Sequence, residues 1–224
     1  MVGNTSKDSM YLTRIKDKTE SDRKHPRHNG VRMQAHHAIS AEGVRLSGMG
    51  NQLVRFKYDI NLLPNLVFIP STLQGACHLG VQPHRGDHVA PIAGDGEEDH
   101  DDDRPLTYHL LVSARIFEVR SLLKGKCPKQ NPKVIEEVEK KMNGISKQLI
   151  GLIQKAPAMA PLTNVASSFM PLNKTGCAGV DSVSDHQKSK CPVGRDHDGQ
   201  QGPKQRREGI SLRKPIVYLL EAGR

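Results

Sequence analysis

The chain has 224 residues, 36% of them hydrophobic and 4% aromatic, and its formal net charge is +9. This length allows one or two domains, and the positive charge favours a polyanion, an acidic protein or an anionic surface as partner. No apolar run approaches the ~18 residues of a membrane-spanning helix, which excludes an integral membrane protein. The four cysteines are too few for a disulfide scaffold in a chain this long, and they fit a reducing compartment.

The first 30 residues are polar, charged and without hydrophobic periodicity, so we interpret residues 1–30 as a tail or linker. They lack the apolar stretch of a secretory signal peptide, and export would need a specialised route or a larger parent protein. We expect the folded domain over residues 31–155. Residues 156–224 are rich in Pro, Ser and Gly with weak periodicity, and they predict an irregular C-terminal extension.

Two segments in the middle of the chain have clear local signals. Residues 66–70, Leu-Val-Phe-Ile-Pro, predict a short buried strand that ends at Pro70 and has Asn65 at its entrance. Residues 94–105 contain seven Asp and Glu side chains beside one arginine, and this acidic insertion predicts a solvated loop.

Two helices follow the acidic insertion. Residues 106–125 have apolar side chains at helical spacing, among them Leu110, Ala114 and Phe117, and the helix should end at Gly125. A second helix should begin with Asn131 as its cap and a proline at its first position. Its predicted apolar stripe is Ile135, Val138, Met142, Ile145, Leu149 and Leu152. Strand and helices together indicate an α+β fold.

The positions of the histidines indicate a metal site with an adjacent general base. His84 and His88 are four residues apart, a spacing that turns both rings the same way on one helical turn or in a tight loop. With His36 they would complete a site of three imidazoles, which leaves a coordination position open, as in catalytic metal sites. The adjacent His37 should point elsewhere and could act as a general base, because an unperturbed imidazole titrates near neutral pH.

These residues, in this order, resemble a known family. The triplet Ala35-His36-His37, the stretch Asn-Leu-Val-Phe-Ile-Pro over 65–70 and His-Arg-Gly-Asp-His over 84–88 are similar to the AHH family of nucleases, a branch of the His-Asn-His superfamily. The family occurs as toxin domains in bacterial polymorphic toxin systems. The resemblance covers roughly residues 31–125. It implies a ββα-metal nuclease core, to which this chain adds amphipathic helices and its C-terminal extension.

The resemblance also implies roles for individual residues. His36 resembles the first metal ligand and His37 the general base that activates water to hydrolyse a phosphodiester. Asn65 resembles the central asparagine, which fixes the loop and orients the base. The matches to the helix-borne metal ligands and to the tyrosine that begins the family's final helix are His84, His88 and Tyr108.

Two assignments have rivals in the sequence. Asn61 competes with Asn65 for the central asparagine, and Asn65 is preferred because the apolar strand begins directly after it. His109 competes with His88 for the last metal position, because the acidic insertion separates His88 from Tyr108.

The expected cofactor is one divalent metal ion, with Zn, Ni, Mg and Mn all compatible. The expected substrate is DNA, with RNA as the alternative, bound through phosphates without sequence specificity. Arg85 is either a phosphate contact or a solvated charge. A toxin of this type would be delivered by a specialised secretion system, would act in the cytoplasm of the target cell, and would need an acidic immunity protein in the producing cell.

A second group of candidate ligands lies in the C-terminal extension. Two thiols and two imidazoles there match the ligand set of a structural zinc site: Cys177, His186, Cys191 and His197. They lack a Cys-x2-Cys pair, so buried thiols and exposed histidines are the favoured explanation. The alternative function is therefore a non-catalytic, zinc-stabilised module that binds nucleic acid or protein. The two functions differ at His37, which has a duty only in the nuclease.

Overall fold

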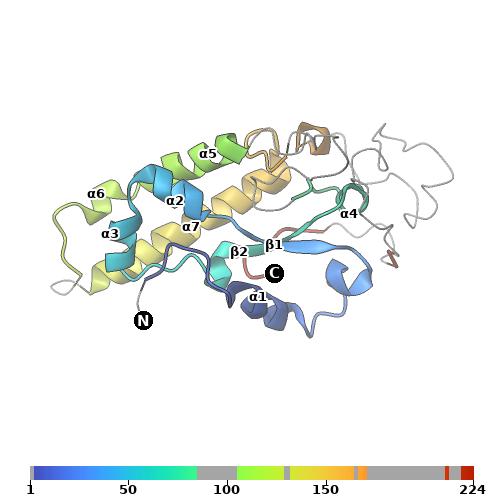
Figure 1. Ribbon diagram of the computed structural model, residues 1–224, viewed down its shortest axis with the longest axis horizontal. Helices are drawn as coiled ribbons and strands as arrows, with labels where there is room; N and C mark the ends of the chain where they lie inside the picture. The colour runs from blue at the N-terminus through green and yellow to red at the C-terminus, as the bar shows by residue number, and fades with distance from the viewer. Residues whose placement is uncertain (1–2, 85–104, 129–131, 164–165, 171–209, 212–217) are drawn as a thin grey trace.

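The structure is a computed structural model, which describes residues 3–84, 105–128, 132–163, 166–170, 210–211 and 218–224. Its elements combine short and long helices with one two-stranded sheet, which confirms the α+β class (Figure 1). In chain order they are α1 (Tyr11–Thr19), η1 (Pro26–Asn29), β1 (Met33–His37), α2 (Ala41–Ser47), α3 (Gly50–Arg55), η2 (Leu63–Asn65), β2 (Leu66–Pro70), α4 (Leu73–Leu79), α5 (Pro105–Phe117), α6 (Arg120–Leu123), α7 (Lys133–Lys155) and η4 (Ala166–Phe169).

The two strands form an antiparallel pair in the middle of the described chain. The register runs from Met33 opposite Pro70 to His37 opposite Leu66. All five residues of β2 are buried, which confirms the predicted buried strand and its end at Pro70. Branched and aromatic side chains suit a pleated, buried surface, and Pro lacks the backbone N–H that a continuing strand would need.

Helices cover both faces of this hairpin (Figure 1). Because side chains alternate along a strand, Leu66 and Phe68 point to one face, where they pack against Ile15 of α1. Val67 and Ile69 point to the other face and belong to the larger core built with α2, α3, α5 and α7. The hairpin is therefore the middle layer between α1 and the remaining helices.

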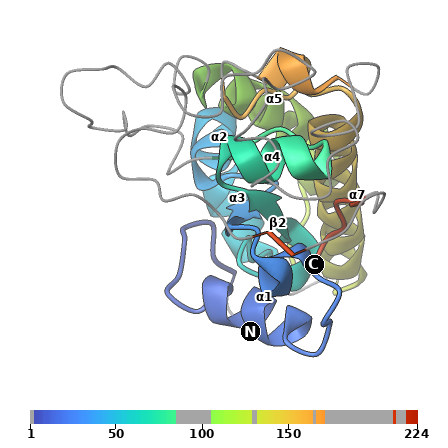
Figure 2. The ribbon, with the colours of Figure 1, turned by 90° about the vertical axis from the view of Figure 1, so that its right-hand side faces the viewer.

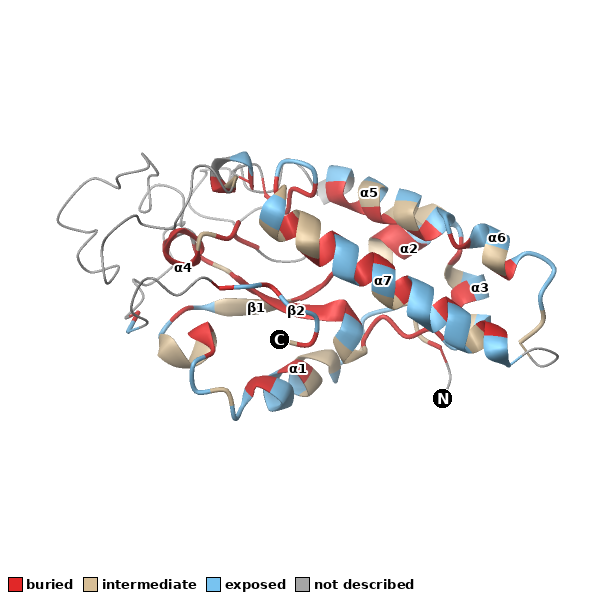
Figure 3. Ribbon diagram, turned by 180° about the vertical axis from the view of Figure 1, so that it is seen from behind, coloured by how far each residue is buried: buried red, intermediate tan, exposed pale blue. Residues whose placement is uncertain are grey.

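The long helix α7 has the predicted apolar stripe. Val138, Met142, Ile145 and Leu149 are buried, and the buried stripe runs along one side of the helix (Figure 3). Ser146 on the same side donates a hydrogen bond of 2.8 Å to the carbonyl of Pro64, which ties α7 to the entrance of β2. Asn131, the expected cap, lies outside the described residues. None of the described helices is long and apolar enough to cross a membrane.

Helix α5 begins where it was expected, but it ends at Phe117 and not at Gly125, with the separate helix α6 after it, and the predicted apolar face was also wrong. Leu110 and Phe117 are 51% and 49% exposed, whereas Tyr108, Val112 and Ile116 are fully buried. This segment has apolar residues at helical spacing on both sides, so periodicity alone does not choose between them. The contact with α2 decides which side faces the core.

The N-terminal segment is ordered by tertiary contacts, although the sequence predicted a tail or linker. It contains α1 and η1, and Ile15 has no exposed surface. Arg14 forms an ion pair of 2.8 Å with Asp8 at the beginning of this helix. Most residues of α1 are polar, and they dominate its exposed side. The composition of the segment therefore does not indicate its few apolar contacts.

Residues 218–224 lie beside β2, with the C-terminus next to that strand (Figure 2). The Phe68 N–H donates to the carbonyl of Arg224 at 2.9 Å, and the Gly223 N–H donates to the carbonyl of Leu66 at 2.6 Å. These hydrogen bonds continue the backbone pairing at the edge of the hairpin. The described end of the predicted C-terminal extension is thus part of the same core.

A pair of helical glycines provides a test of the helix packing. A Cβ built on Gly43 of α2 would lie 2.4 Å from Cγ1 of Val112 on α5, whereas one on Gly144 of α7 would meet nothing within 4 Å. Gly43→Ala should lower the free energy of unfolding by ~1–3 kcal/mol, because α2 and α5 must separate. Gly144→Ala should raise it by up to ~1 kcal/mol. Urea titrations measure both, and an equal effect at the two positions would contradict the close approach.

A buried histidine predicts how stability depends on pH. His25 has no exposed surface, and its Nδ1 accepts a hydrogen bond from the Arg27 N–H. Burial, with the charge of Arg224 adding to it, lowers the pKa of His25 from 6.5 to about 4. As the pH falls, the unfolded chain therefore binds this proton first. The stabilisation is complete above pH 6.5 and is lost as the pH falls from 6.5 toward 4.

His25→Asn keeps a side-chain acceptor for the Arg27 N–H but does not titrate. Its free energy of unfolding should decline less steeply than that of the wild type between pH 6.5 and 4. Chemical denaturation at a series of pH values measures the two slopes. Identical slopes would mean that His25 is not the titrating group.

Candidate functional site

The candidate site is built around the last two residues of β1, His36 and His37. Adjacent residues of a strand point to opposite faces. His36 lies opposite Val67 on the face covered by α5, and His37 lies opposite Leu66 on the face covered by α1. Both histidines are almost fully buried, with 2% and 4% of their surface exposed. Each imidazole therefore depends on its own set of buried partners.

On the first face, His36 contacts Tyr108 and His84. The ring centroids of His36 and His84 are 4.6 Å apart. The hydroxyl of Tyr108 donates its only proton to the carbonyl of Ala38 at 2.6 Å. Its oxygen must then accept from Nε2 of His36, at 3.1 Å. His36 thus carries its proton on Nε2 in the neutral form.

His84 is held at this face by its backbone and by its ring. Its N–H donates to the carbonyl of Pro70 at 2.8 Å, at the end of β2. Its Nδ1 donates to Oε1 of Gln34 at 3.0 Å, and Gln34 shares a face of β1 with His36 because it is two residues earlier. The resemblance implied that His84 lies on a helix, whereas its spacing to His88 also allowed a tight loop. His84 follows the end of α4, where Gly80 adopts a left-handed conformation and ends the helix.

The pair of imidazoles is chemically suited to a divalent metal ion. In His36 and His84 a hydrogen bond keeps one ring nitrogen protonated, and in the neutral ring the other nitrogen is the one that can ligate a metal. Within the described residues they form a pair, because no group of three possible ligands gathers there. His88, the expected third ligand, and Arg85, the expected phosphate contact, lie outside the described residues.

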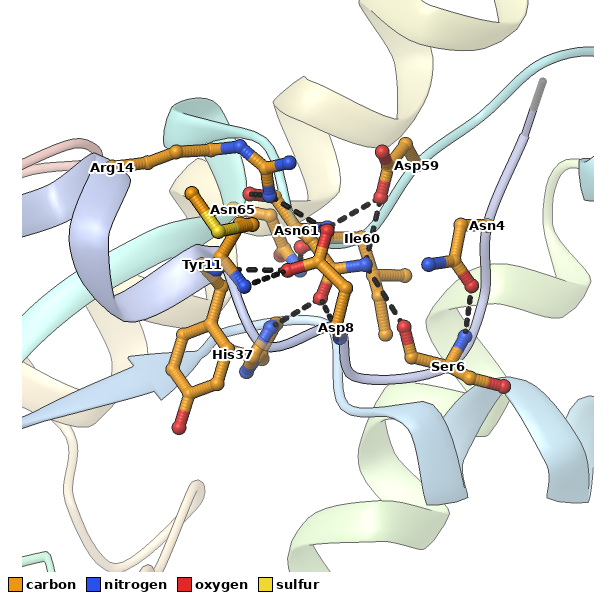
Figure 4. Close-up of polar contacts among 11 residues, drawn as sticks. Asn4, Ser6, Asp8, Tyr11, Arg14, His37, Asp59, Ile60, Asn61 and Asn65 are labelled. Carbon is orange, nitrogen blue, oxygen red and sulfur yellow. Dashed lines mark hydrogen bonds and ion pairs between the residues drawn. The ribbon is translucent and has the colours of Figure 1, made fainter.

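On the second face, His37 is oriented by Asn61 (Figure 4). The Asn61 amide nitrogen donates to the Ser6 carbonyl at 2.9 Å and to Oδ1 of Asp59 at 2.9 Å. These bonds leave its Oδ1 facing Nε2 of His37 at 3.1 Å, so Nε2 must be the donor. The unprotonated nitrogen of neutral His37 is therefore Nδ1, the atom able to accept a proton.

Tyr11 and burial complete the surroundings of His37. The Tyr11 ring packs against the imidazole with a centroid distance of 4.5 Å and an angle of 54° between the planes (Figure 4). Burial lowers the pKa of His37 to about 4, against the hydrogen bond to Asn61, which raises it; the charge of Lys7 lowers it further. An unperturbed imidazole, as assumed from the sequence, would have a pKa near neutrality. At pH 7 the ring is in its neutral, proton-accepting form.

Asn65 contacts the loop after β1 and not His37. Its amide nitrogen donates to the carbonyls of Ile39 and Ile60, and its oxygen accepts from the Ile39 N–H at 2.7 Å. These bonds fix the loop after β1, as expected of the central asparagine. The side chain that orients His37, however, is Asn61, so that part of the assignment to Asn65 was wrong. Asn65 is directed at backbone groups because it closes η2 directly beside the loop.

Of the remaining candidate residues, only His109 lies within the described residues. His109, the rival of His88, has its Nδ1 2.8 Å from Oγ of Ser40, and burial lowers the pKa of its ring. The acidic insertion up to residue 104 and the candidate zinc ligands Cys177, His186, Cys191 and His197 lie outside the described residues.

Several residues of the site were not singled out from the sequence. Gln34 could have been found, because it is two residues before His36 on a strand and therefore shares its face. Tyr11, Ser6 and Asp8 had no such signal, since they belong to a polar segment without periodicity.

More than half of the chain matches the model of one protein family. Residues 15–148 match the family model AHH, described as a nuclease family of the HNH/ENDO VII superfamily with conserved AHH. Ala35, His36 and His37 lie within this range. Neither the curated proteins nor the solved structures contain a match to the chain.

The two asparagines should differ in what they stabilise. Asn65→Ala leaves three buried backbone groups of Ile39 and Ile60 without their partner and should lower the free energy of unfolding by more than ~2 kcal/mol. Asn61→Ala should instead change the ring ¹⁵N chemical shifts of His37, because it removes the acceptor for Nε2. Denaturation and histidine NMR distinguish the two. A His37 shift that responds only to Asn65→Ala would contradict the geometry.

Proposed function

The chain belongs to the AHH nuclease family of the HNH/ENDO VII superfamily, and we propose that it is a metal-dependent endonuclease that hydrolyses phosphodiester bonds of DNA. One observation carries the proposal. At the end of β1, His36 meets a second buried imidazole on one face, while His37 on the other face is held with Nδ1 unprotonated. These are the groups needed for metal binding and for proton transfer.

His36 and His84 would hold the metal, with His88 as the proposed third ligand. A divalent ion supplies positive charge that stabilises the negative charge developing on the phosphate. Gln34 and Tyr108 keep one nitrogen of each ring protonated, as the neighbours of metal-ligating histidines commonly do. In this proposal β1, β2 and α4 form the ββα unit, within a nuclease domain over residues 31–155.

His37 is the proposed general base. It accepts a proton from the attacking water at Nδ1, and the positive charge that the ring then carries is stabilised through Nε2 by the oxygen of Asn61. Asp59 lies behind Asn61 and accepts from its backbone N–H at 2.8 Å as well as from its amide. The Asp59 carboxylate therefore holds Asn61 in place, and Asn61 in turn orients His37.

Charge and the family support the proposed substrate and the proposed biological role. A net charge of +9 favours a polyanion, and binding through phosphates without base recognition suits DNA of any sequence. We extend the proposal to an antibacterial effector toxin, delivered by a specialised secretion system to the cytoplasm of a target cell. Such a toxin requires an immunity protein in the producing cell, and an acidic one complements the charge.

Cleavage assays test the proposal directly. Plasmid DNA and RNA are incubated with the purified chain in Mg²⁺, Mn²⁺, Zn²⁺, Ni²⁺ or EDTA, and bound metal is measured in parallel. His37→Ala should reduce cleavage at least ~100-fold with metal content unchanged, because it removes the base. His84→Ala should lose both cleavage and metal.

The control is His28→Ala, which removes a histidine bonded to the Thr19 carbonyl away from the site. It should cleave DNA like the wild type. Near-normal cleavage by His37→Ala would refute the assignment of the base, and preference for RNA would correct the substrate.

A further inference from the structure

The N-terminal segment lies directly against residues 58–61, which include the asparagine that orients His37. The Asn4 N–H donates to the carbonyl of Tyr58 at 2.9 Å, and the Ile60 N–H donates to the carbonyl of Asn4 at 2.9 Å. This pairing is a parallel β-bridge between Asn4 and Asp59. It places the next residues of the segment beside the Asn61 side chain.

The segment bonds both ends of the Asn61 amide. Nδ2 donates to the carbonyl of Ser6 at 2.9 Å, and Oδ1 accepts from the Asp8 N–H at 3.1 Å. A carbonyl accepts only from the amide nitrogen, and an N–H donates only to the amide oxygen. The two contacts therefore select the orientation in which the oxygen faces His37. The flipped amide would present an N–H to Nε2 of His37 and so favour protonation at Nδ1.

The same segment places an aromatic ring on His37. The carboxylate of Asp8 accepts from the Tyr11 N–H at 2.8 Å and so begins α1. Arg14 bonds the other oxygen of Asp8 at 2.8 Å and the backbone carbonyl of Asn61 at 3.2 Å. These contacts direct the Tyr11 ring onto the imidazole of His37 (Figure 4). The ring limits rotation of the imidazole away from Asn61.

We propose that residues 4–14 are a positioning element of the nuclease site: they hold the Asn61 amide and the Tyr11 ring so that His37 keeps its proton on Nε2 and its Nδ1 ready to accept one. The proposal rests on the proposed function in so far as His37 is the base. Residues 4–14 precede the range that matches the family, residues 15–148, so this element is a feature of the present chain and not of the matched family range.

Two variants disturb the element while leaving His37 itself unchanged. Gly3→Ala places a Cβ 2.6 Å from the carbonyl oxygen of Val54 and 2.9 Å from that of Tyr58, which forces the segment outward. Tyr11→Ala removes the ring, and Tyr11→Phe keeps it. The matched control for the glycine change is Gly144→Ala, where the added methyl meets nothing within 4 Å.

Two kinds of measurement are needed. The ring ¹⁵N shifts of His37, assigned with His37→Gln, report which nitrogen carries the proton in the full chain and do not require activity. Steady-state cleavage of a DNA duplex gives kcat and KM, and bound metal is counted for each variant.

Gly3→Ala and Tyr11→Ala should move the His37 shifts toward a mixture of tautomers and lower kcat at least ~10-fold, with KM and metal content within about twofold of the wild type. Tyr11→Phe should restore the wild-type shifts and most of kcat. Gly144→Ala should match the wild type in both measurements.

Wild-type shifts and wild-type kcat in Tyr11→Ala would overturn the proposal, as would a loss of kcat that Tyr11→Phe does not restore. If Gly3→Ala does not fold, the two Tyr11 variants still decide the question. If the wild-type chain cleaves no nucleic acid, the proposed function fails, whereas the tautomer measurement still shows whether residues 4–14 position His37.

Discussion

The alternation of side chains along β1 is the constraint on which the candidate site depends. Adjacent residues of a strand point to opposite faces, so His36 and His37 have separate partners. His36 meets His84 and Tyr108 on one face, and His37 meets Asn61 and Tyr11 on the other. A register shift of one residue would exchange the two sets. The pairing with β2, whose residues are all buried, prevents such a shift.

Burial makes the hydrogen bonds of the imidazoles decisive. A buried ring needs a partner for its N–H, and the partner determines which nitrogen carries the proton. Gln34 does this for His84, Tyr108 for His36 and Asn61 for His37. Each partner thereby fixes which nitrogen of the neutral ring is unprotonated: Nδ1 in His36 and His37, and Nε2 in His84.

A two-stranded sheet is marginally stable by itself, which explains why distant parts of the chain gather on the hairpin. The helix α1 covers Leu66 and Phe68, and residues 218–224 pair with the backbone of β2. The cover over the face of His37 also brings Tyr11 and the backbone that holds Asn61. Stabilisation of the hairpin and orientation of the candidate base are therefore achieved by the same segment.

The sequence by itself determined what depends on local pattern: the strand over 66–70 and the long helix α7. It left open what depends on distant contacts. Asn61 and Asn65 were rivals in the sequence, where the strand after Asn65 favoured that residue, and only the fold directs Asn61 to His37 and Asn65 to the backbone of Ile39. Packing against α2 and α7 determines which face of α5 is exposed. The polar N-terminal segment has no pattern at all, because its order comes from hydrogen bonds to residues more than fifty positions away.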